Sequence, residues 1–146
     1  MSSIAVQPTE WLQALQARGF RVTPTKEALL VLLTRAAFPL SAEKAWEFVR
    51  GERPYTGRAT IYRLFDTLEE LGFLRRVHGL HHCNQYVLAQ DSERPLVVCV
   101  SCGKAEFLAD DALQLQLEAL TQQCGYRLHA AHIQLLGMCS VCQTRS

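Results

Sequence analysis

The 146-residue sequence contains no long apolar run, and its first residues do not place a basic stretch before an apolar one. A membrane-spanning helix needs about 18 or more consecutive apolar residues, and a secretion signal needs a basic start followed by an apolar core. We therefore expect a cytoplasmic protein with no membrane partner. In that compartment the six cysteines indicate metal or thiol chemistry rather than a disulfide framework.

Strong charge of either sign is also lacking, since the formal net charge is only +1. Residues 1–89 carry 11 basic and 8 acidic side chains, a net +3, whereas residues 90–146 carry 4 basic and 6 acidic ones, a net −2. This small asymmetry suggests that only the first part meets a polyanion. We expect two domains, residues 1–89 and residues 90–146.

Four of the cysteines form two pairs with the same spacing, Cys99 with Cys102 and Cys139 with Cys142. Two cysteines separated by two residues can turn both sulfurs toward one point, and two such pairs complete the tetrahedral thiolate site that Zn²⁺ prefers. The 36 residues between the pairs must hold a small folded unit. Two disulfides or one redox-active pair are the alternatives, although a redox pair usually stands alone beside a βαβ unit. We predict a structural zinc site, because four thiolates leave no position open for a substrate.

Residues 1–89 read as short helices followed by two strands. Helices are expected over residues 10–18, from Thr23 and Pro24, from Ser41 and from Arg58 to a glycine at 72, on the basis of apolar spacing and capping residues. Strands are expected over residues 73–77 and about 82–88, joined by a turn at residues 78–79. This order predicts a winged helix-turn-helix domain, whose last helix enters the major groove of DNA.

The start of that last helix carries side chains suited to DNA. Arg58 and Arg63 can contact phosphates or a guanine edge, Thr60 can donate to a phosphate, and Tyr62 offers a ring with a hydroxyl group. The alternative is an ordinary solvated helix start. Trp11 and Trp46, elsewhere in the same domain, are expected to pack in its core.

Residues 90–146 read as strands around one helix. Strands are expected over residues 96–99, 105–108, 126–129 and 132–136, and the helix over residues 112–123. Its leucines at 113, 117 and 120 lie on one face. So small a unit with an apolar helix face and an exposed strand edge suggests that the chain forms a homodimer. Cys124, alone at the helix end, is expected to be packed.

The order of motifs resembles the ferric uptake regulator family of bacterial metal-sensing repressors, from about Trp11 to Cys142. The motifs are Arg21-Val-Thr-Pro-Thr-Lys26, Ser41-Ala-Glu43, Ala59-Thr-Ile-Tyr-Arg63, Cys99-Val-Ser-Cys102-Gly-Lys104 and Leu136-Gly-Met-Cys-Ser-Val-Cys142. The resemblance implies an α+β protein with an N-terminal winged-helix DNA-binding domain and a C-terminal α/β dimerisation domain. It also implies a structural zinc site of four cysteines and a second, regulatory metal site. By motif, the DNA-contacting or DNA-adjacent positions are Arg21, Lys26, Thr60, Tyr62 and Arg63, although the family more often has Gln-Arg where this chain has Thr25-Lys26.

The chain departs from the family where the regulatory ligands usually lie. The family often has a histidine-rich run before the first cysteine pair, but residues 92–96 contain no histidine. The usual histidine before the second pair is replaced by Ala131, with His129 and His132 on either side, and residues 38–40 lack a further one. The usual regulatory site therefore cannot be assembled.

A different cluster can replace it. His78, His81, His82 and Cys83 lie within six residues on the expected wing, and residues 81 and 83 face the same side of an extended strand. The resemblance gives Glu106 as a match to an acidic regulatory ligand. We predict a sensory site built on this cluster and completed by Glu106 or His129 from the other domain. The alternative is that the histidines only contact phosphates and that Cys83 is a buried apolar residue.

A thiolate with imidazoles suits Zn²⁺ better than Fe²⁺ or Mn²⁺. We therefore predict a zinc-responsive transcription regulator, most like the zinc uptake regulator branch, whose affinity for double-stranded DNA is raised by a second Zn²⁺. Regulation by iron or peroxide is an alternative, as is a zinc-stapled module that never binds DNA. An enzyme is not expected, because no histidine here has glutamate two residues on, as zinc-dependent deaminases require.

Overall fold

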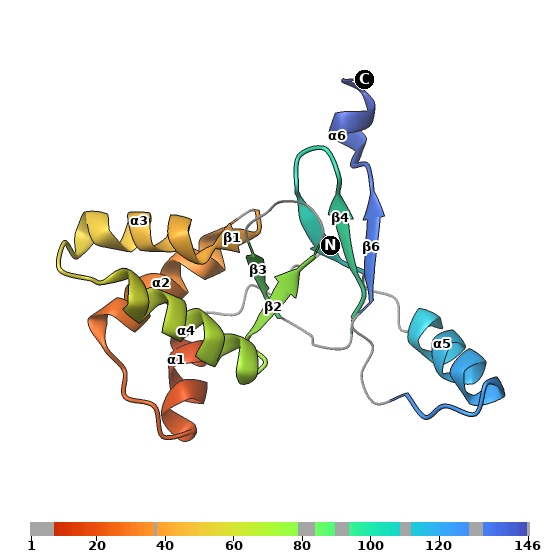
Figure 1. The fold of residues 1–146 in the computed structure, drawn as a ribbon, viewed down its shortest axis with the longest axis horizontal. Helices are drawn as coiled ribbons and strands as arrows, with labels where there is room; N and C mark the ends of the chain where they lie inside the picture. Colours follow the sequence, from red (N-terminus) through yellow and green to blue (C-terminus); the bar gives the residue numbers. More distant parts are fainter. Residues whose placement is uncertain are drawn as a thin grey trace. The chain divides into compact units, whose positions relative to one another are not determined.

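The computed structural model describes residues 8–36, 38–78, 84–89, 94–108, 112–128 and 133–145. The chain divides into two compact units, Met1–Gln90 and Asp91–Ser146, and each combines helices with a three-stranded sheet (Figure 1). Among the described residues no helix is long and apolar enough to cross a membrane. The α+β class predicted from the sequence is confirmed.

Of the four helices described in the first unit, three begin at their predicted positions, and the first begins two residues before the predicted residue 10. They are α1 (Pro8–Ala17), α2 (Pro24–Arg35), α3 (Ala42–Glu52) and α4 (Arg58–Glu70). The Thr23 side chain accepts a hydrogen bond from the Lys26 backbone N–H, and the Ser41 side chain accepts one from the Lys44 N–H. Each cap satisfies a helix N–H that has no partner within its own helix. After α4, Gly72 has a φ of +79°, which favours glycine over residues with a Cβ.

The sheet of the first unit has the order β1-β3-β2, with both pairs antiparallel. Its strands are β1 (Leu40–Ser41), β2 (Leu74–Val77) and β3 (Gln85–Leu88). Residues 82 and 83, where the second predicted strand was to begin, lie outside the described residues. The two-residue β1 was not predicted, because so short a segment has no sequence period of its own. The helices followed by a two-stranded ribbon confirm the predicted winged-helix outline.

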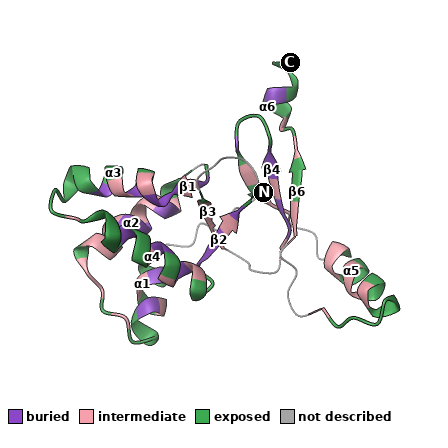
Figure 2. Cartoon of the chain, viewed as in Figure 1, coloured by how far each residue is buried: buried purple, intermediate pink, exposed green. Residues whose placement is uncertain are grey.

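The core of the first unit decides which side of α4 faces outward. Ile61, Phe65 and Leu68 of α4 are buried, and the Phe65 and Tyr86 rings lie 5.1 Å apart. Trp11 is buried against Phe73, with ring centroids 4.5 Å apart, as predicted. Figure 2 shows the buried stripe of α4 alternating with an exposed one.

An ion pair ties the C-terminal part of α4 to the wing. Both Glu69 carboxylate oxygens accept hydrogen bonds from Arg76 of β2, at 3.1 and 2.8 Å. The Arg76 guanidinium also lies over the Tyr86 ring of β3, 5.5 Å from its centroid. The hydrogen bonding of Arg76 to the Glu69 carboxylate is the main cause of the raised pKa of Arg76. These contacts fix the ribbon relative to α4.

The second unit is built on β4 (Leu96–Cys99), flanked by β5 (Ala105–Phe107) and β6 (Gln134–Gly137). Strands β4 and β5 are antiparallel, and β4 and β6 are parallel. Helix α5 (Ala112–Gln123) has the predicted bounds, and the short α6 (Ser140–Gln143) was not predicted. The predicted strand over residues 126–129 is wrong for Tyr126–Leu128, which follow the turn at Gly125 without forming a strand.

Little of the second unit is buried. Among its described residues the buried apolar side chains are Pro95, Leu96, Val98, Cys99 and Cys142, and none of the residues of α5 is buried. The prediction that Cys124 is packed is wrong, because this residue is exposed. Its position just past the last turn of α5 carries it into solvent.

Candidate metal centre and nucleic-acid interface

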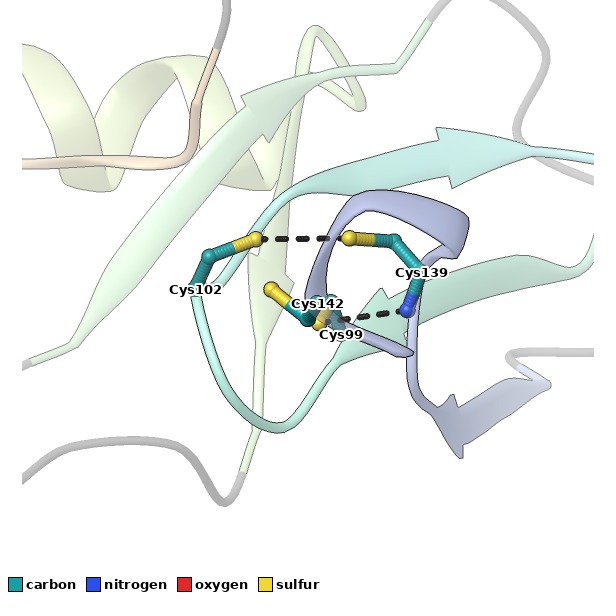
Figure 3. A group of neighbouring side chains, drawn as sticks. All are labelled: Cys99, Cys102, Cys139 and Cys142. Atoms are coloured by element: carbon teal, nitrogen blue, oxygen red, sulfur yellow. Dashed lines mark hydrogen bonds between the residues drawn. The ribbon is translucent and has the colours of Figure 1, made fainter. Parts of the chain in front are cut away.

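The pairing of β4 with β6 brings the two cysteine pairs together. Cys99 ends β4 and lies in register with Gly137, the last residue of β6. The chain then continues into Cys139, the N-cap of α6, and Cys142 within that helix. The other cysteine of the first pair lies in the turn after β4, which is closed by Gly103 at a φ of +80°. Figure 3 shows the four side chains turned toward one another.

The spacing of the sulfurs fits a tetrahedral metal site. All four Sγ atoms lie within 4.8 Å of one another, and those of Cys102 and Cys139 are 3.8 Å apart. A tetrahedron with Zn–S bonds of about 2.3 Å has edges of about 3.8 Å. A disulfide would instead require a separation of about 2.05 Å, and the described cysteines are free. The geometry therefore fits a cation held between thiolates.

The local hydrogen bonds favour ionised sulfur at Cys99 but not at Cys142. The Cys139 backbone N–H donates to Cys99 Sγ at 3.4 Å. This bond, with one from the Cys102 backbone, lowers the pKa of Cys99 to about 6. At Cys142 a hydrogen bond from the Ser101 side chain lowers the pKa, but bonds with the neighbouring thiols and burial outweigh it and raise the pKa to about 11. Four sulfurs this close cannot all ionise without a cation to offset their repulsion.

Next to this centre, Glu106 of β5 pairs with Lys104. Their Nζ and Oε1 atoms are 2.7 Å apart, and both side chains are largely exposed. The hydrogen bond and charge of Glu106 raise the pKa of Lys104, with smaller contributions from the thiols of Cys139 and Cys102. Glu106, a predicted sensory ligand, thus has a cationic partner in this structure.

Most of the remaining candidate ligands of the sensory site lie outside the residues that the structure describes. His78 directly follows β2, whereas His81, His82, Cys83 and His129 lie outside the described residues. Among the described residues, the four cysteines are the one group of three or more metal-ligating side chains that lie close enough together to hold an ion. The sensory site stays a prediction.

The DNA-facing candidates gather at the start of α4. Arg58, Thr60, Tyr62 and Arg63 are all exposed, whereas Ile61, Phe65 and Leu68 of the same helix are buried. Arg63 Nε donates to the Ala59 carbonyl of its own helix at 3.2 Å. The side chains are therefore available to a ligand that approaches α4 from solvent.

Two further DNA-binding candidates come from the family motif. Arg21 lies before α2, and Lys26 lies in its first turn and contacts Arg21. Lys26 Nζ donates to the Arg21 carbonyl oxygen at 2.6 Å and lies 5.8 Å from the centroid of the Phe20 ring. This places the ammonium group close to the helix start. Their DNA-contacting role stays a prediction.

Sequence reasoning missed two residues of α3 that hold the start of α4. Glu43 accepts from Tyr62 Oη at 3.1 Å and pairs with Arg58 at 2.9 Å. The Arg58 guanidinium also lies over the Trp46 ring, 4.5 Å from its centroid. Trp46 is only partly buried, so its predicted core role is correct only in part. The available signal was the three-residue spacing of positions 43 and 46, which share one face of a helix.

Comparison with known proteins agrees with this architecture. Residues 17–136 match the ferric uptake regulator family. A ferric uptake regulation protein of Neisseria meningitidis is 30% identical over 132 residues, which cover 90% of this chain and 92% of that protein. The zinc uptake regulation protein of Escherichia coli is 27% identical over 130 residues, covering 86% of this chain and 74% of that protein.

A solved structure of similar fold is a zinc uptake regulator complexed with zinc and DNA. Its TM-score is 0.73 at 22% sequence identity, and the match covers 99% of this chain and 98% of that one. At this identity the likeness shows the fold alone, whereas the family match spans most of the chain. The chain therefore belongs to the ferric uptake regulator family of metal-responsive transcription regulators.

Proposed function

We propose that this protein is a zinc-responsive, DNA-binding transcription regulator that acts as a homodimer in the cytoplasm. The observation that carries the proposal is the orientation of α4, which buries Ile61, Phe65 and Leu68 and leaves basic and aromatic side chains in solvent. In a winged-helix unit this is the helix that enters the major groove, and we call it the recognition helix. The ribbon of β2 and β3 then lies along the DNA backbone.

The chemistry of the recognition helix supports DNA as its ligand. Arginine can bind a guanine edge or a phosphate, and tyrosine can contact a base or a phosphate. The N-cap residue, Gly57, makes no side-chain cap hydrogen bond, so the first N–H groups of α4 can also face phosphate oxygens. A dimer would present two such helices to the two halves of a quasi-palindromic site.

The second unit supports dimerisation. Leu120 of α5 is exposed, as are Leu135 and Leu136 of β6, and β6 is an outer strand of its sheet. Exposed apolar side chains beside an unpaired strand edge are stabilised when a second copy covers them. The predicted face of leucines 113, 117 and 120 is also open to a partner, since no residue of α5 is buried within the chain.

The four-cysteine centre is proposed to hold a structural Zn²⁺. Cys99, Cys102, Cys139 and Cys142 would supply four thiolates, and the ion would fix the ends of β4 and β6 together. A closed four-thiolate site has no coordination position for a substrate. The role of this centre is therefore to stabilise the second unit rather than to catalyse a reaction.

A second Zn²⁺ is proposed to control DNA affinity. Its ligands would be Cys83 with His78, His81 or His82, completed by Glu106 or His129. The thiolate and imidazole donors favour zinc over iron, although relatives named for iron and for zinc match the chain at similar identity. An ion that links two units biases their orientation by its differential affinity for the two arrangements.

The function is tested with the full-length protein. Fluorescence anisotropy with DNA selected from a randomised duplex library would measure affinity with Zn²⁺, Fe²⁺ or Mn²⁺ added. We expect one tightly held zinc per chain and a further rise in DNA affinity with Zn²⁺ alone. A larger response to Fe²⁺ would make this an iron regulator, and no selected DNA under any condition would contradict the regulator assignment.

The sensory site is tested by Cys83→Ser and by a His81→Ala, His82→Ala double substitution. Both are expected to keep the structural zinc and the fold but to lose the zinc-dependent rise in DNA affinity. Cys124→Ser and His132→Ala are the matched controls and should respond as the parent does. A parent-like response from the wing variants would show that regulation lies elsewhere.

A further inference from the structure

One acidic side chain of α3 contacts two of the exposed residues at the start of the recognition helix. Glu43, in the first turn of α3, places its Oε1 atom 2.9 Å from Arg58 Nη2 and accepts from the Tyr62 hydroxyl at its Oε2, 3.1 Å away. The two oxygens of one carboxylate thus each hold a different side chain of α4. Those two residues are four apart in the helix and share one face.

A tryptophan completes the support for Arg58. Trp46 lies one turn after Glu43 on α3, and its ring carries the Arg58 guanidinium 4.5 Å from its centroid and that of Arg50 4.9 Å from it. Trp46 Nε1 donates to the Thr56 carbonyl at 2.8 Å, which fixes the ring against the turn before α4. Arg58 is therefore held at its charged end by a carboxylate and on its planar face by an anchored ring.

The arrangement is too exposed to contribute much to folding. The Arg58 and Glu43 side chains are 61% and 35% exposed, and ion pairs of this kind rarely stabilise a fold appreciably. A carboxylate on a surface that meets phosphate groups also weakens DNA binding by simple repulsion. What the carboxylate does supply is a fixed position for two side chains that would otherwise be mobile.

We propose that Glu43 is a positioning residue that sets how well the recognition helix distinguishes its operator from other DNA. By holding Arg58 and Tyr62 in one geometry, Glu43 presents them to base edges. It also keeps the Arg58 guanidinium from binding whichever DNA phosphate lies nearby. Removal of the carboxylate releases Arg58 to the backbone of any sequence. The affinity for the operator then falls, because Arg58 and Tyr62 are no longer held in the orientation that the base edges require. The affinity for non-specific DNA rises, because Arg58 adds a phosphate contact. This inference rests on the proposed DNA-binding function.

The test compares Glu43→Gln with Glu47→Gln in the zinc-loaded full-length protein. Glu47 lies on the same helix and is exposed, so its replacement makes the same charge change away from Arg58 and Tyr62. Affinities would be measured by anisotropy over a range of salt concentrations. The two probes are a duplex enriched by the parent protein from a randomised library and a scrambled duplex of the same composition.

We expect Glu43→Gln to lower the ratio of operator to scrambled affinity about tenfold, the order of discrimination that one well-placed base contact supplies. On scrambled DNA its plot of log affinity against log salt should steepen by about 1, because one more phosphate contact releases one more counterion. Glu47→Gln should change neither quantity. The melting temperature and zinc content should be those of the parent in both variants.

The possible results distinguish a failure of this inference from a failure of the proposed DNA-binding function. If the parent enriches no sequence from the library, the DNA-binding proposal fails. If the parent discriminates and both glutamine variants keep its ratio and salt slope, Glu43 is only a surface ion pair and the inference is overturned. The inference is also overturned if Glu43→Gln raises the affinity for both duplexes by the same factor, since that result shows only the loss of a negative charge and no effect of positioning.

Discussion

Replacement of Cys139 with serine is expected to remove the structural metal and to unfold the second unit, while the first unit stays folded. Cys139 contributes its sulfur to the four-cysteine cluster and its backbone N–H to Cys99. Serine keeps the N–H but offers an oxygen that Zn²⁺ binds less well than thiolate in such a site. The change therefore isolates the contribution of one sulfur.

The magnitude follows from how little else is buried there. Pro95, Leu96 and Val98 are the only fully buried apolar side chains among the described residues of the second unit, and a buried leucine or valine contributes about 1.5–3 kcal/mol. Structural zinc in small peptides binds with apparent free energies of about 10–16 kcal/mol, which are also folding free energies. The metal thus outweighs the apolar core, and its loss should leave the unit unfolded.

Zinc content per chain and amide hydrogen exchange would measure the outcome. Cys139→Ser should lose about one zinc, and the β4 amides should lose their protection while those of α4 keep theirs. Cys124→Ser is the matched control, because Cys124 is exposed and lies outside the cluster. Full zinc retention with protected β4 amides in Cys139→Ser would refute the reasoning.

Three further outcomes can be measured. Arg63→Ala should weaken operator binding by about 1–3 kcal/mol with unchanged zinc content; parent-like affinity in a binding titration would mean that α4 is not the recognition helix. Leu136→Glu, which places a charge on an exposed apolar residue of β6, should yield monomers by analytical ultracentrifugation of the zinc-loaded protein, and a persistent dimer would move the interface elsewhere. Zinc affinity, measured by competition with a chelator, should rise with pH above 7, because the pKa of Cys142 is raised to about 11 and its proton must leave when zinc binds. Below about pH 6 the affinity should fall more steeply, since Cys99, with its pKa lowered to about 6, then also binds a proton; a pH-independent affinity would argue against thiolate ligands.

Most helices and strands could be predicted from the sequence, because their signals are local. Thr23 and Ser41 cap the helices that their positions predict, and the helix of residues 112–123 has the expected bounds. Prediction failed where a local signal was not followed by pairing with another strand. Tyr126–Leu128 have strand-like residues but no strand, because pairing with a neighbour, rather than propensity, decides whether such a segment joins a sheet.

The cysteine spacing predicted which residues could form a metal centre, but the tertiary structure brought them together. The parallel register of β4 and β6 places Cys99 beside Gly137, and no sequence pattern encodes a pairing between segments almost 40 residues apart. The contacts of Glu43 were still harder to predict from the sequence. In the sequence it is a first-turn helix residue, and only the packing of α3 against α4 brings its carboxylate to Arg58 and Tyr62. Local chemistry fixes each element, whereas contacts between distant side chains depend on how the buried faces of those elements pack.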